Sequence, residues 1–231
     1  DAALFDGMNE PYIPFCAGPE HPSLVRHSQT SKLASPPAIS EDDLNTLLAP
    51  ELREGGIVSA VQLDAIALGR KAHLASRAFL VGDSTGLGKG RTGVGALWNG
   101  FLLDSADKVG RRAVYFSTAQ VLETLQRDVR DFGIDVAVVD VRGSRSLPRD
   151  RDVVLFVSYL SLPNKAKTGS ETNLEFIQRF VAEAPNNDTV PIVIDEAHTV
   201  KNCHGTGASG SAKAAFQLFT NLRDASRMTF M

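Results

Sequence analysis

The sequence predicts an α/β domain in which a mainly parallel sheet is covered by helices on both faces. After about residue 50, short Val- and Ile-rich runs alternate with amphipathic stretches of helical period. Runs that are apolar throughout are typical of strands buried on both faces. Two further features follow strands: a glycine-rich turn at residues 82–90 and the adjacent carboxylates of Asp195 and Glu196. In parallel sheets, sites form at the carboxyl ends of strands.

The composition is that of an ordinary globular protein, with 43% hydrophobic residues among 231 and a formal net charge of −3. A nucleic-acid partner would therefore need local basic patches. The two cysteines form no CxxC pair, so neither a zinc site nor a disulfide framework is indicated. The first residues, DAALFDGMNE, do not read as a signal peptide, and no apolar run approaches the roughly 20 residues that span a bilayer. We expect an intracellular protein without membrane contact, cytoplasmic if bacterial or phage and nuclear if eukaryotic. Because no initiator Met is present, we expect a fragment of a longer chain.

Residues 1–50 are rich in proline and are predicted to form an irregular arm that packs on the main domain, residues 51–231. One short helix is expected near Ser40–Leu48, and a disordered linker is the alternative for the rest. In the main domain, strands are expected at residues 78–83, 112–118, 135–141, 152–159, 190–198 and 226–231. Helices are expected at residues 61–75, 90–103, 119–133, 173–184 and 211–225.

The glycine-rich turn lies between a predicted strand and a predicted helix, as a phosphate-binding loop requires. Its backbone N–H groups would cradle phosphates, and Lys89 would reach the β- and γ-phosphates of ATP. The residues expected to contact the nucleotide here are Thr85, Gly86, Leu87, Gly88, Lys89 and Gly90. The hydroxyl that usually follows the lysine and binds Mg²⁺ is missing, because Gly90 stands there; Thr92 is the nearest hydroxyl and the candidate replacement. A plain strand–turn–helix corner is the alternative.

The run Ile192–Ile194 delivers two carboxylates to the end of its strand. Asp195 is suited to hold Mg²⁺ through water, and Glu196 to orient or deprotonate an attacking water. His198 would relay the nucleotide state to other parts of the protein. A strand that runs into a solvated acidic turn is the alternative.

These two segments, GDSTGLGKGR and VIDEAHTVKN, resemble helicase motifs I and II. More narrowly, residues 10–231 resemble the strawberry notch family of helicase-like ATPases. The pair Gly90-Arg91 after the lysine is a feature of that family, so the resemblance implies that the missing hydroxyl is a family trait. Gln62 falls where the helicase Q motif places an adenine-reading glutamine, and Arg91 joins the expected nucleotide contacts.

The resemblance implies a P-loop NTPase fold, the first RecA-like lobe of a superfamily-two ATPase that uses ATP and Mg²⁺ and acts on nucleic acid, DNA more than RNA. The sequence stops before motif III and lacks the second RecA-like lobe, so we expect this fragment alone to be nearly inactive. A regulatory or scaffolding module in transcription or genome defence, without unwinding, is one alternative. An Snf-type remodelling ATPase is another, although Gly90-Arg91 argues against it.

Several polar residues have weaker indications. The ends of two strands are candidates for nucleic-acid contacts: Ser117, Thr118, Ser158 and Tyr159. A basic loop that holds Arg142, Arg145, Arg149 and Arg151 is either a phosphate contact or solvated charge. Lys108, Arg111 and Arg112 are expected to be surface charge at the opposite edge of the sheet.

Overall fold

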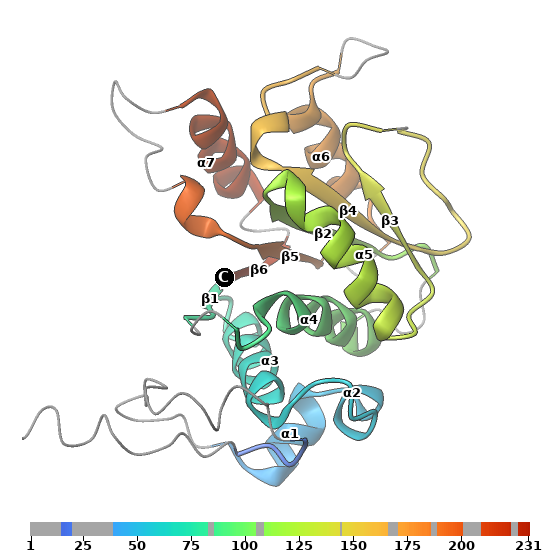
Figure 1. Cartoon of the computed structure of the whole chain (residues 1–231), viewed down its shortest axis with the longest axis vertical. Coiled ribbons are helices and arrows are strands. Elements are labelled where there is room, and N and C mark those ends of the chain that lie inside the picture. The colour runs from blue at the N-terminus through green and yellow to red at the C-terminus, as the bar shows by residue number, and fades with distance from the viewer. Residues whose placement is uncertain are drawn as a thin grey trace, which may run out of the picture.

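A six-stranded parallel sheet forms the centre of the part of the chain that the computed structural model describes (Figure 1). The structure describes residues 15–19, 39–82, 86–104, 109–143, 145–165, 171–185, 189–200, 209–222 and 226–231. The strands are β1 (Phe79–Leu80), β2 (Arg112–Ser117), β3 (Val136–Asp140), β4 (Asp152–Ser158), β5 (Val190–Ile194) and β6 (Ser226–Phe230), in the spatial order β1-β6-β5-β2-β4-β3. The predicted α/β fold is confirmed, and all six predicted strands are present. The first is shorter than predicted, with two residues.

Helices cover both faces of this sheet. One face carries α3 (Ala60–Leu74), α4 (Lys89–Asp104) and α5 (Leu122–Asp131), and the other carries α6 (Asn173–Ala182) and α7 (Gly210–Leu222) (Figure 1). Before α3 come the short helices α1 (Glu41–Leu47) and α2 (Pro50–Glu54). Each of the predicted helices is present. Strands β2, β4 and β5 are buried along nearly their whole length, which is why their sequences are apolar on both faces.

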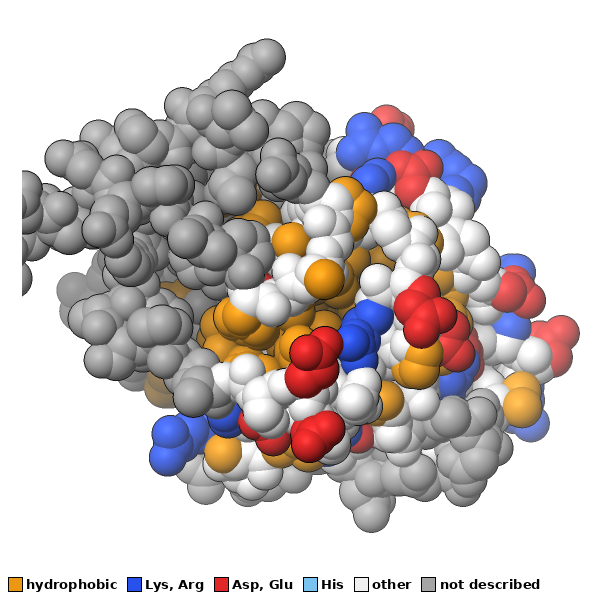
Figure 2. All heavy atoms as spheres, turned by 90° about the horizontal axis from the view of Figure 1, so that it is seen from below, with side chains coloured by type: hydrophobic (Ala, Val, Ile, Leu, Met, Phe, Trp, Pro, Cys, Tyr) orange, Lys and Arg blue, Asp and Glu red, His pale blue; other side chains and the backbone are white. Residues whose placement is uncertain are grey.

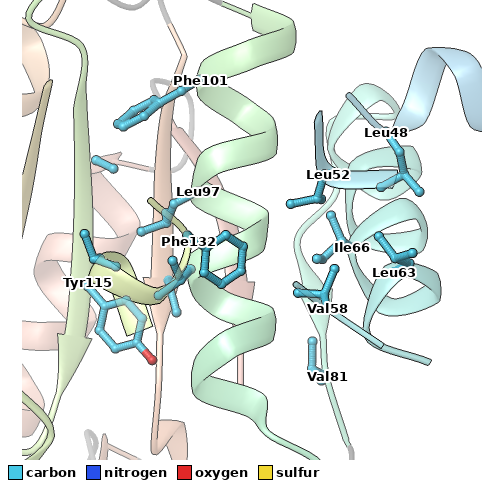
Figure 3. Close-up of a cluster of buried hydrophobic side chains, with 14 of the residues drawn as sticks. Leu48, Leu52, Val58, Leu63, Ile66, Val81, Leu97, Phe101, Tyr115 and Phe132 are labelled. Atoms are coloured by element: carbon cyan, nitrogen blue, oxygen red, sulfur yellow. The ribbon is translucent and has the colours of Figure 1, made fainter. Parts of the chain in front are cut away.

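The core on the α3–α5 face has two layers, with α4 between them (Figure 3). Leu97 and Phe101 of α4 point toward Tyr115 and the sheet, whereas Leu63 and Ile66 of α3 lie on the far side of α4. Small residues permit this close contact, because a Cβ on Gly95 would meet Ile66 Cδ1 at 2.6 Å. The helix that follows the glycine-rich turn is therefore fixed on both sides.

The first helices pack on the same face, below α3 in Figure 1. The predicted short helix near Ser40–Leu48 is present as α1, which begins with a capping box between Ser40 and Asp43. Earlier in the chain, the backbone N–H groups of Phe15 and Cys16 donate to the carboxylate of buried Asp64. The division of the chain at residue 50 stays a prediction.

The amino edge of the sheet corrects one expectation. Arg111 is not surface charge: its guanidinium pairs with Asp152 at 2.6 Å, and both side chains are about nine-tenths buried. It also lies over the rings of Trp98 and Phe101. Arg112 donates to the carbonyl of Phe180 at 2.7 Å. The two arginines are thus part of the packing between strands and helices, and Lys108 lies outside the described residues.

The predicted basic loop is also tied to the fold. Arg145 pairs with Glu171 at 2.6 Å and lies over the ring of Phe176. Arg142, half exposed, pairs with Asp140 at the end of β3. These two cations are therefore neutralised within the chain, which weakens the phosphate-contact hypothesis for this loop.

The outer surface near α1 and α2 is mixed. Figure 2, which views the molecule from below, shows hydrophobic side chains beside acidic and basic ones there. Across the described residues, no helix has the length and hydropathy that a membrane crossing needs.

Candidate active site

The glycine-rich turn leads from β1 into the first turn of α4. Gly86 and Gly88 have φ angles of +96° and +73°, which L side chains rarely adopt, on either side of buried Leu87. Backbone that alternates in this way forms anion-binding concavities. Because α4 begins at Lys89, the positive end of its helix dipole faces this turn. Thr85 lies outside the described residues.

Gln62 is connected to this turn from the side of α3. Its Nε2 donates to the carbonyls of Leu87 at 3.0 Å and Gly88 at 3.2 Å, and its Oε1 accepts from the backbone N–H of Ser59. Gln62 is 3% exposed, so it is not an ordinary surface residue of α3. The amide ties the start of α3 to the phosphate-binding turn.

The side chains of Arg91 and Thr92, which follow Lys89, both contact other groups of the protein. The Arg91 guanidinium pairs with Asp131 of α5 at 2.8 Å and also reaches the carbonyl of Ile57. Thr92 is 1% exposed, and its hydroxyl lies 3.4 Å from the carbonyl of Gly88, the residue just before α4. The Thr92 hydroxyl is thus turned toward the backbone of the phosphate-binding turn.

Asp195 directly follows β5 at the same edge of the sheet and is 8% exposed. Its Oδ2 accepts from the Ser117 hydroxyl at 2.8 Å, and its Oδ1 accepts from the Glu196 backbone N–H at 3.0 Å. The Tyr159 hydroxyl donates to the Asp195 carbonyl at 2.5 Å. The ends of β2 and β4 therefore hold both the side chain and the backbone of Asp195 in place.

Lys89 and Asp195 act on each other electrostatically. Burial raises the pKa of Asp195. The hydrogen bond from Ser117 and the charge of Lys89 lower this pKa, but they do not cancel the effect of burial. The adjacent charge of Glu196 raises this pKa further. A buried carboxylate of this kind gains most from a cation, because its charge is poorly solvated without one.

Glu196 has a left-handed backbone, with φ of +54°. Non-glycine residues in this conformation cost of order 1–3 kcal/mol and are enriched at functional sites. The turn leads into a short 3-10 helix, η5 (Ala197–Val200), and leaves the Glu196 side chain 46% exposed. His198 Nδ1 lies 3.2 Å from Glu196 Oε2. The carboxylate of Glu196 is therefore accessible to water, unlike that of Asp195.

An open hollow of about 440 Å³ borders the turn, between the loop before α3, the start of α4 and α5. Its size lies in the range of small-molecule sites. Gln62, Gly88, Gly90, Arg91 and Asp128 contribute to its lining. The predicted residues Gln62 and Arg91 thus share one hollow with the phosphate-binding turn.

Ser117, Ser158 and Tyr159 are not exposed for a nucleic acid, contrary to one hypothesis from the sequence. All three are at least 95% buried, and Ser117 and Tyr159 are bonded to Asp195. Thr118 is the N-cap of the 3-10 helix η3 (Ala119–Val121), and no cap hydrogen bond comes from its side chain. Ser117 and Tyr159 therefore hold Asp195 in place and do not face a nucleic acid.

The sequence analysis predicted neither the support that Ser117 and Tyr159 give Asp195 nor a role for Asp128. Ser117 and Tyr159 could have been identified from their position at the ends of β2 and β4, because the carboxyl ends of neighbouring parallel strands lie close together. Asp128 interrupts the apolar face of α5 between Leu125 and Val129, with all three side chains at most 5% exposed. A buried carboxylate on an otherwise apolar helix face is itself unusual.

Comparison with known proteins places this geometry in context. Residues 20–231 match the model of a family described as P-loop containing NTP hydrolase pore-1. Strawberry notch homolog 1 of Gallus gallus is 32% identical over 213 residues, covering 85% of this chain and 16% of that protein. Strawberry notch homolog 2 of Homo sapiens is 30% identical over 218 residues, covering 89% of this chain and 15% of that protein. The chain therefore spans less than a fifth of the length of these relatives.

Two solved structures are more distant. A Sulfolobus solfataricus SWI2/SNF2 ATPase core in complex with dsDNA has a TM-score of 0.43 and 15% identity, covering 72% of this chain and 30% of that chain. A nuclease-deletion mutant of the Type ISP restriction-modification enzyme LlaGI, in complex with a DNA substrate mimic, has a TM-score of 0.46 and 17% identity, covering 74% of this chain and 17% of that chain.

Proposed function

Because this strawberry notch-like chain belongs to the P-loop containing NTP hydrolase pore-1 family, we propose that it binds ATP and Mg²⁺ at the carboxyl edge of its sheet. The observation that carries this proposal is the approach of two segments far apart in sequence. The first turns of α4 pack against the end of β5, because a Cβ on Gly93 would meet Val193 Cγ1 at 3.2 Å. Lys89 at the start of α4 and Asp195 just after β5, 106 residues apart, are thereby brought to the same edge of the sheet. A phosphate-binding turn and a buried carboxylate so arranged are what a nucleotide with a divalent cation requires.

The residues present fit these groups. Backbone N–H groups around Gly86 and Gly88 would hold the phosphates, and Lys89 would offset their charge. Asp195 would bind the cation, whose positive charge stabilises the β- and γ-phosphate oxygens when it is present. The adenosine part would lie in the hollow beside Gln62 and Arg91.

For hydrolysis, we assign the proton-accepting role to Glu196. Its side chain is accessible and His198 lies beside it, so a water between Glu196 and the terminal phosphate could lose a proton to the carboxylate. Ser117 and Tyr159 keep Asp195 in position while this happens. A second RecA-like lobe would supply the cations that stabilise the transition state.

We also propose a nucleic-acid partner, on the strength of the motif resemblance. Since the polar groups that end β2 and β4 are buried, the contacts would come from exposed residues of the turns that follow. Gln120 on η3 is exposed, and so is Leu160, on η4 (Tyr159–Ser161). ATP hydrolysis by the full-length protein that increases on addition of DNA or RNA would support this partner. Hydrolysis indifferent to both would favour the scaffolding alternative.

Calorimetric titration with ATP tests the nucleotide proposal. Wild-type chain should bind ATP more tightly with Mg²⁺ than with EDTA. Lys89→Ala should weaken binding by about 10- to 100-fold, because a charge-assisted contact contributes about 1.5–3 kcal/mol. Lys213→Ala, on the exposed side of α7, is the matched control and should bind like wild type. Absence of ATP binding to wild type, or equal binding by Lys89→Ala, would contradict the proposal.

A further inference from the structure

Asp128 is a buried carboxylate whose presence on α5 the fold alone does not explain. It is 5% exposed and lies on the face of α5 that packs into the core. Its Oδ1 accepts a hydrogen bond from Arg127 Nη2 at 3.3 Å, but that arginine side chain is 60% exposed and screened by water. Among the residues that the structure describes, Asp128 thus has only a weak side-chain partner, and burial of such a carboxylate costs free energy.

The other oxygen of Asp128 faces Gly90. A Cβ built on Gly90 would lie 3.3 Å from Asp128 Oδ2. Phosphate-binding loops usually carry Ser or Thr at this position, and the hydroxyl binds the cation of the nucleotide. In this chain the side chain is missing, and a carboxylate oxygen from another helix borders the space that it would fill. Thr92, the nearest hydroxyl downstream, is 1% exposed, and its hydroxyl donates to the Gly88 carbonyl at 3.4 Å.

The surroundings connect Asp128 to Asp195. A Cβ on Gly93 would meet Val193 Cγ1, two residues before Asp195, at 3.2 Å, whereas a Cβ on Gly90 would lie 3.3 Å from Asp128 Oδ2. The first turns of α4 therefore pack against both β5 and α5. One carboxylate comes to these turns from each of these two elements.

We propose that Asp128 supplies the oxygen ligand that Ser or Thr supplies in other phosphate-binding loops, so that Asp128 and Asp195 together hold the divalent cation. This inference rests on the proposed nucleotide site. Replacing a neutral hydroxyl with a carboxylate adds one negative charge beside the phosphates. The cation is then held more tightly, and nucleotide without a cation is repelled more strongly. Binding of nucleotide and of cation should therefore be unusually interdependent.

Asp128→Asn tests this, with an ATP analogue that resists hydrolysis and with Mn²⁺ followed by its paramagnetic resonance signal. The variant should lose about tenfold or more in Mn²⁺ affinity for the chain–analogue complex. In EDTA it should bind the analogue about threefold or more tightly than wild type, because a repelling charge is gone. A purely structural role for Asp128 would weaken binding in both conditions. Asp135→Asn, at a side chain that is 88% exposed, is the control and should behave like wild type.

Asp128→Cys is the second variant and retains a small side chain that tolerates burial. It should bind Mn²⁺ poorly with the analogue but recover affinity with Cd²⁺, because thiolates prefer soft metals. Wild-type affinity for Mn²⁺ in Asp128→Asn, with analogue binding intact, would overturn the role of Asp128 and leave the nucleotide site standing. Failure of wild-type chain to bind the analogue even with Mn²⁺ would overturn the proposed function itself.

Discussion

Replacing Gln62 with alanine should both destabilise the fold and loosen the phosphate-binding turn. The Gln62 side chain makes three hydrogen bonds in a buried setting, two to turn carbonyls and one from the Ser59 N–H. Each such bond contributes about 1 kcal/mol net, so the free energy of unfolding should fall by about 2–3 kcal/mol. For a chain of this size, that corresponds to a Tm about 5–10 °C lower.

Urea unfolding and ATP titration measure the two effects. Gln217→Ala, on the exposed side of α7, is the matched control and should change stability by less than about 0.5 kcal/mol. If Gln62 positions the turn, the variant should lose affinity for ATP and GTP by the same factor. Selective loss of ATP affinity would support the adenine-reading role expected from the motif resemblance. A stability equal to that of the control would refute the hydrogen-bond argument.

Two further predictions concern the carboxylates that follow β5. Because burial raises the pKa of Asp195 above 3.8, the folded chain binds this proton more tightly than the unfolded chain, and unfolding free energy falls as pH rises from 3.8 through the raised value. Asp195→Asn should thus have a higher free energy of unfolding than wild type at pH 7 without nucleotide, and this free energy should depend less on pH over that interval. Urea unfolding between pH 4 and 7 measures both effects. A variant less stable than wild type at pH 7 would contradict this argument. Glu196→Gln should keep ATP affinity within about threefold but, in the full-length protein, slow single-turnover hydrolysis by about 100-fold or more. Unchanged hydrolysis there would exclude Glu196 as the base.

The order of strands and helices could be predicted because each element carries its own periodicity. Runs such as Val153–Val157 are apolar throughout and flanked by turn residues, which is enough to identify a buried parallel strand. The phosphate-binding turn and the acidic strand end are local too, since each is contiguous in sequence. Because the carboxyl ends of parallel strands lie at one edge of the sheet, the turn and the acidic strand end are expected to lie close together.

Side-chain partners far apart in sequence could not be predicted in the same way. Arg111 and Asp152 are 41 residues apart, and only the alignment of β2 with β4 makes them a buried pair. Asp128 next to Gly90 depends on how α5 packs against α4. Periodicity reports which face of a helix is buried but not which residue of another helix it contacts.

Amide chemical shifts of isotope-labelled chain during titration with ATP analogue and Mg²⁺ test the central claim most directly. We predict the largest changes at Gly86, Gly88 and Lys89, with smaller ones at Asp195 and Glu196. Amides at the amino edge, such as those of Arg111 and Asp152, should not shift. Changes concentrated at the amino edge, or absent from the turn at saturating analogue, would contradict a nucleotide site at the carboxyl edge of this sheet.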